Sequence, residues 1–145
     1  RSCLVGSEMC IRDSIKTGEL VFINAGHESI LTFDQNKNYE YIKSDMPPIG
    51  IVKYFTESMV KSNTMNLKDK TFVVYTDGVT EGYLKNGEEL GAEGVQKIID
   101  GMSDVTPKTI VESIEKELNW GAEKLRDDIT CMAININNTE LIKKK

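Results

Sequence analysis

The sequence has no long apolar run, no closely paired cysteines and only one histidine, and each absence excludes a class of protein. No segment approaches the roughly 18 to 20 apolar residues needed to cross a bilayer, so no membrane contact is predicted. The first residues show no basic stretch followed by an apolar one, and therefore no signal peptide is visible. Because the lone histidine has no partner at zinc-binding spacing, a zinc site is not indicated.

The cysteines and the net charge indicate which cellular compartment and which classes of partner fit the sequence. Cys3, Cys10 and Cys131 form no CxxC pair, which favours a reducing, cytoplasmic compartment. Cys131 lies in an apolar strand pattern, where a thiol usually behaves as a small buried hydrophobe. The net charge of −5 argues against nucleic acid or an anionic membrane as a partner. The basic residues near the end belong to a predicted solvated tail at 138–145.

The first half of the sequence has the pattern of an antiparallel sheet. Short apolar runs rich in β-forming residues alternate with polar turns. Two prolines and a glycine exclude regular structure at 46–50. The predicted strands are residues 20–24, 30–33, 39–42, 54–64 and 71–75.

The second half is predicted to be helical and to end in a strand. One helical stripe consists of four apolar residues at helical spacing: Val95, Ile98, Ile99 and Met102. A second helix begins with Thr106 as a hydroxyl cap and Pro107 at its first position, and Gly121 is a plausible stop. Its predicted buried residues are Ile110, Val111, Ile114 and Leu118. With a last strand at 129–136, the order of elements predicts an α+β layered domain.

Two acidic sites lie where a predicted strand meets a loop. Asp77 follows the strand at 71–75, and the pair Asp127 and Asp128 precedes the last strand. Functional sites on rigid scaffolds are usually built at such places. Gly78 allows a sharp turn, so the carboxylate of Asp77 can point along the strand axis. Carboxylates that converge without a counter-charge repel one another, and a cation bound only by oxygen is typically magnesium, manganese or calcium.

Each of these features also has a plainer interpretation. Asp-Gly after a strand is a common hairpin turn, and Asp-Asp before a strand is commonly a solvated loop. For His27, a structural turn is favoured over catalysis. The acidic turns of a generic α+β domain could also be incidental.

Six motifs in a fixed order carry more information than any one of them. They are NAGH at 24–27, PPIG at 47–50, YTDGVTEG at 75–82, EELGAEGV at 88–95, TPKTIVESI at 106–114 and DDIT at 127–130. Their order and spacing resemble those of the SpoIIE/RsbU family of PPM-type (PP2C-like) serine/threonine phosphatases. The resemblance extends from about residue 17 to residue 136.

The resemblance implies an antiparallel β-sandwich flanked by helices, with a binuclear manganese or magnesium site at one edge. It places metal ligands at Asp77 and Asp127, with Gly78 and Asp128 in supporting roles, and it assigns no other residue as catalytic. The implied reaction is hydrolysis of phosphoserine or phosphothreonine by a metal-activated water. The implied substrate is a phosphorylated regulatory protein of the anti-sigma factor antagonist type. The alternative is a catalytically inactive relative that binds a signalling partner.

The sequence departs from the family pattern before residue 15. Family members carry an earlier Asp-x-x-Gly-His-Gly-like segment that supplies a metal-bridging aspartate. Asp13 lacks the glycine that should follow and is not assigned that role. Because residues 1–14 have neither a helical nor an alternating period, we expect a non-native leader there. Residues 15–137 would then be the carboxyl-terminal two-thirds of an amino-terminally truncated domain, with a sensor domain upstream in the full-length protein and little activity in this chain.

Overall fold

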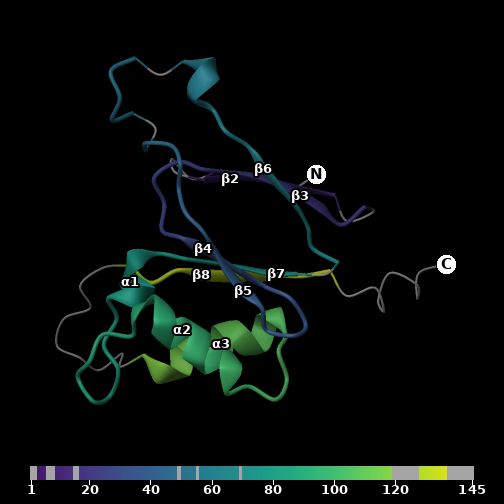
Figure 1. Cartoon of the computed structure of the whole chain (residues 1–145). Helices are drawn as coiled ribbons and strands as arrows, with labels where there is room; N and C mark the ends of the chain where they lie inside the picture. The colour runs from purple at the N-terminus through teal and green to yellow at the C-terminus, as the bar shows by residue number, and fades with distance from the viewer. Residues whose placement is uncertain are drawn as a thin grey trace. The chain divides into compact units, whose positions relative to one another are not determined.

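The computed structural model of the chain describes residues 3–5, 9–14, 17–48, 50–54, 56–68, 70–118 and 128–136, with side chains from residue 17 onward (Figure 1). It divides into two compact units. The first comprises Arg1–Phe72 and Asn135–Lys145, and the second comprises Val73–Ile134. No helix within the described ranges is both long enough and apolar enough to cross a membrane.

An antiparallel sheet of four strands forms much of the first unit. Strand β3 alternates between buried and partly exposed residues, with Leu20, Phe22 and Asn24 on its buried face. This period of two is the one expected of a strand that covers a core on one side. The strand order is β1 (Cys3–Val5), β2 (Met9–Ser14), β3 (Glu19–Asn24) and β6 (Asn63–Asn66).

A hairpin of β4 (Ile30–Phe33) and β5 (Tyr39–Ile42) also belongs to the first unit, with Thr32 opposite Glu40. Both strands lie where the sequence predicts them. The turn between them is organised by Asp34, whose Oδ1 accepts the backbone N–H groups of Asn36 and Asn38 at 2.8 and 3.0 Å. Hydrogen bonds from Asn38 lower the pKa of Asp34 from its ordinary value. A short polar side chain that binds the backbone ahead of it is a standard turn former.

The strand predicted at 54–64 is wrong for most of its length. A 3₁₀ helix, η1 (Glu57–Met59), interrupts it, and β6 starts only at Asn63. Tyr54 is 75% exposed and Val60 is 41% exposed, so the loose alternation of apolar residues does not mark a buried face. Alternation predicts a strand only where one side chain in two has a core to enter.

At the amino terminus, by contrast, the structure has a strand that the sequence does not predict. The sequence shows no period before residue 15, yet β2 pairs with β3 through six consecutive residues. Strand pairing uses backbone N–H and C=O groups, and it therefore does not require a pattern in the side chains. The proposed boundary between a leader and the domain at residue 14 stays a prediction.

The second unit holds the end of β7 and the helices. Strand β7 (Thr71–Tyr75) begins in the first unit, is buried throughout and has β8 (Cys131–Ile134) as a neighbour. The predicted strands at 71–75 and 129–136 are thus present, the second in a shorter form. A short helix, α1 (Asp77–Thr80), follows β7 directly (Figure 1).

Helices α2 (Gly91–Asp100) and α3 (Pro107–Glu117) lie where the two apolar stripes predict them. The stripes are only partly buried, because Met102 follows the end of α2 and the side chains of Ile98 and Val111 are half-buried. Helix α3 contacts β8 and begins at a capping box in which the side chains of Thr106 and Thr109 each accept a backbone N–H of the other residue. The helix ends at Glu117, and the predicted stop at Gly121 lies outside the described residues. The residues that the two helices bury are Val95, Ile99, Ile110 and Ile114.

Two glycines with nearly equal backbone angles give a matched test of packing in the fold. Gly26 has φ of +82°, and a Cβ placed there would lie 2.2 Å from Cγ of Pro48. Gly87 has φ of +85°, and no atom lies within 4 Å of such a Cβ. Alanine at either position costs about 1–2 kcal/mol because of the left-handed backbone. Only Gly26→Ala adds overpacking against the proline, which typically costs about 1–3 kcal/mol more.

Urea unfolding followed by circular dichroism should therefore show a larger loss of stability for Gly26→Ala than for Gly87→Ala. Equal losses in the two variants would contradict the close packing of the NAGH turn on the PPIG segment.

Candidate functional site

The end of β7 presents the first acidic residue that the sequence singles out. Asp77 is exposed and begins α1, and its Oδ1 accepts the backbone N–H of Gly78 at 2.9 Å. Among the described residues, no lysine or arginine forms an ion pair with Asp77. The hairpin interpretation of Asp77 and Gly78 is wrong, because the pair opens a helical turn closed by the N–H of Glu81 on Asp77 O at 2.7 Å. A carboxylate in the first turn is also favoured by the partial positive charge there.

The second acidic motif lies beside this strand end. Asp128 is exposed and precedes β8, whereas Asp127 lies outside the described residues. The backbone N–H of Thr76 donates to Thr130 O at 3.0 Å. The hydroxyl of Thr76 donates to Asp128 O at 2.9 Å and accepts the N–H of Thr130 at 3.0 Å. The end of β7 and the start of β8 are therefore neighbours, as in an antiparallel pair.

The two acidic motifs therefore lie close together at Thr76. Asp77 follows Thr76 in the chain, and the backbone oxygen of Asp128 accepts the hydroxyl of Thr76. The convergence of Asp77 with Asp127 itself stays a prediction. Sequence reasoning missed Thr76. In the sequence Thr76 is simply a hydroxyl residue between an apolar strand and an acidic residue. That position gives no indication of hydrogen-bond partners more than fifty residues away.

The aspartates of the two motifs provide oxygen ligands of the type that divalent cations bind. Carboxylate oxygens are the ligands that magnesium and manganese take, and in the described part of the chain Asp77 forms no ion pair that would compete with a cation. Within the described ranges, no three histidine, cysteine, aspartate or glutamate side chains cluster as a complete metal site. Of the three aspartates in the two acidic motifs, the structure describes only Asp77 and Asp128.

The NAGH motif is organised as a turn, in agreement with the structural interpretation of His27. Asn24 is buried, and its Oδ1 accepts the backbone N–H of His27 at 3.0 Å. Its Nδ2 donates to Glu28 O at 3.1 Å. Ser44 fixes the turn from the other side, because its hydroxyl donates to Asn24 O at 3.0 Å and accepts the N–H of Gly26 at 2.6 Å.

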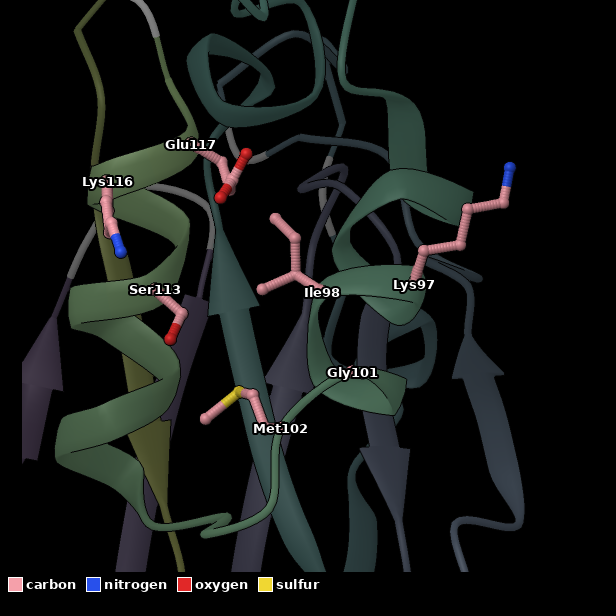
Figure 2. Close-up of a pocket in the computed structure, with 7 residues that line it drawn as sticks. All are labelled: Lys97, Ile98, Gly101, Met102, Ser113, Lys116 and Glu117. Carbon is pink, nitrogen blue, oxygen red and sulfur yellow. The ribbon is translucent and has the colours of Figure 1, made fainter.

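A hollow of about 410 Å³ lies between α2 and α3 (Figure 2). Its apolar lining comes from Ile98 and Met102, and its polar lining includes Ser113 and Glu117. In Figure 2 the side chain of Lys97 extends away from the others. Among the residues that line this hollow, Glu117 carries the only carboxylate.

The family model of stage II sporulation protein E (SpoIIE) matches residues 7–137. The chain belongs to the SpoIIE family. This membership confirms the resemblance carried by the six motifs. The match begins within the segment before residue 15 that lacks a sequence period. No curated protein sequence matches the chain.

Solved structures show that this SpoIIE family member has a PP2C-like α+β fold, as the sequence predicted. The SiaA-PP2C domain of Pseudomonas aeruginosa is 18% identical with a TM-score of 0.67, covering 89% of this chain and 51% of that one. The manganese-presoaked phosphatase domain of SpoIIE from Bacillus subtilis is 19% identical with a TM-score of 0.63, covering 94% and 56%. RsbX in complex with magnesium is 13% identical with a TM-score of 0.56, covering 86% and 53%. The chain spans about half the length of these structures.

Cys131, at the start of β8, is the one cysteine whose side chain the structure describes. Burial raises the pKa of its thiol from 9.0 to about 11, because the low-dielectric surroundings disfavour the thiolate. Two pKa units correspond to about 100-fold less thiolate at neutral pH than in an unperturbed thiol.

Alkylation of Cys131 by iodoacetamide should therefore be slow at neutral pH and should keep rising with pH beyond 9.0, toward about 11. Mass spectrometry of the peptide that contains Cys131, with N-acetylcysteine as the reference thiol, measures the rate. A rate that matches the reference at neutral pH would contradict the partial burial of this thiol.

Proposed function

We propose that this chain belongs to a metal-dependent protein phosphatase that hydrolyses phosphoserine or phosphothreonine. The observation that carries the proposal is the exposed carboxylate of Asp77, which stands without a basic partner among the described residues at a strand end joined to the Asp128 segment. Family membership and the PP2C-like fold support the same reaction class.

In this proposal Asp77 and Asp127 bind the metal ions. Gly78 shapes the turn, and its N–H orients the carboxylate of Asp77 by the hydrogen bond to Oδ1. Asp128 has a supporting role through its backbone, which Thr76 holds. The cation would be manganese or magnesium, the ions named for the SpoIIE and RsbX structures. When bound, such cations lower the pKa of a water and neutralise charge on the phosphoryl oxygens.

A water nucleophile is favoured over a cysteine nucleophile. Cys131 is three residues from Asp128, but its thiol has a raised pKa and stays protonated at neutral pH. A thiol in that state is a poor nucleophile.

The proposed substrate is a phosphorylated regulatory protein of the anti-sigma factor antagonist type. The exposure of Asp77 suits a phosphate carried on another protein, because the carboxylate is reachable without entry into a closed pocket. A cytoplasmic location and control by an upstream sensor domain are further parts of this proposal.

The variant Asp77→Asn tests the metal role, because it keeps the shape of the side chain and removes its charge. Replacing groups that only support metal ligands typically costs 10- to 100-fold in metal affinity or activity, so loss of a direct ligand should cost about 100-fold or more. Mn²⁺ affinity is measured by titration, and activity by Mn²⁺-dependent phosphate release from a phosphothreonine peptide.

Asp104→Asn is the matched control, since Asp104 is also exposed but lies in the loop before α3. Equal Mn²⁺ binding by the unmodified chain and Asp77→Asn would make the acidic turns incidental. Mn²⁺ binding that depends on Asp77, without hydrolysis even when the upstream part of the domain is supplied, would favour the inactive binding module.

A further inference from the structure

Thr76 occupies the N-cap position of α1 but does not cap it. A threonine at this position usually accepts a backbone N–H from the first turn of the helix through its hydroxyl. The side chain of Thr76 makes no such bond, although its backbone is extended, with φ of −78° and ψ of 162°. The side chain of Thr76 therefore does not have the capping role that threonine usually has at this position.

The hydroxyl of Thr76 instead bridges to the segment before β8. It donates its one proton to Asp128 O at 2.9 Å and accepts the N–H of Thr130 at 3.0 Å, which uses both capacities of a hydroxyl. The backbone N–H of Thr76 adds a third bond, to Thr130 O at 3.0 Å. One residue thus fixes the two ends of the segment Asp128–Thr130 against the end of β7.

These bonds lie between the two acidic motifs. Asp77 is the next residue after Thr76, and Asp127 is covalently bonded to Asp128. Magnesium demands near-ideal octahedral geometry, and functional sites in general tolerate displacements of only about half an ångström. A segment that carries one ligand must therefore be held in place against the strand that carries the other.

We propose that Thr76 is a positioning residue for the proposed metal centre, whose hydroxyl holds the part of the DDIT segment from Asp128 to Thr130 against the strand end that carries Asp77. The inference rests on the proposed function and adds a residue to it.

Removal of the hydroxyl should affect metal binding more than folding. Asp128 and Thr130 are exposed, so water can replace the hydroxyl as the partner of their backbone groups. The strand β7 itself is buried through Thr71–Tyr75 and does not depend on Thr76 for its core. The segment before β8, in contrast, loses two of the three bonds that Thr76 makes to it.

The test compares three variants of the whole chain by Mn²⁺ titration and by thermal unfolding in metal-free buffer. Thr76→Val keeps the shape and removes the hydroxyl, and it should weaken Mn²⁺ binding by about 10- to 100-fold, as loss of a supporting group does. Thr76→Ser restores the hydroxyl and should recover most of the affinity. Thr71→Val makes the same chemical change at the other end of β7 and should leave the affinity unchanged.

Each outcome decides between the two proposals. Unchanged Mn²⁺ affinity in Thr76→Val, alongside a large loss in Asp77→Asn, would overturn the positioning role alone. No Mn²⁺ binding by the unmodified chain, or no loss in Asp77→Asn, would overturn the proposed function as well. Unfolding of Thr76→Val in metal-free buffer would show that the hydroxyl maintains the fold itself and would also overturn the positioning role.

Discussion

Three hydrogen bonds between Thr76 and the segment Asp128–Thr130 are the constraint from which the candidate site is inferred. An acidic residue at the end of one strand becomes part of a site only when a neighbouring strand ends at the same place. In this chain Asp77 and Asp128 are separated by about fifty residues, and the described part of that segment contains α2 and α3. The hydroxyl of Thr76 continues the pairing of β7 and β8 beyond the last strand residue, and so the two acidic segments meet at one edge.

The parts of the fold that the sequence predicts well are those where burial and turn chemistry agree. The strands at 30–33, 39–42 and 71–75 have the predicted bounds. The first and third are buried throughout, and the first two flank a turn built by Asp34. The start of α3 is equally well defined, since Thr106 and Pro107 specify a helix start by local chemistry alone. Turns and helix starts can be predicted from sequence where they are determined by contacts between residues close together in the chain.

The failures arise where tertiary structure decides. At 54–64 the apolar residues alternate, but Tyr54 and Val60 are exposed, so the apparent period does not mark a buried face. Before residue 15 the reverse holds, because β2 acquires its conformation by pairing with β3. The same distinction applies to the site. Asp77 and Gly78 could be found from their place after an apolar strand, but the role of Thr76 lies in partners 52 and 54 positions away and leaves no local pattern.

The chemical nature of the link between the two strand ends also matters for a cation site. Carboxylates brought together before a metal arrives repel one another, and this repulsion opposes the arrangement that the metal needs. A lysine or arginine at the position of Thr76 could hold the same segment, but its charge would neutralise the carboxylates and compete with the incoming cation. A hydroxyl provides directional bonds without net charge. In the proposed metal site it would therefore preorganise the acidic edge and leave the negative charge of Asp77 available to attract a divalent ion.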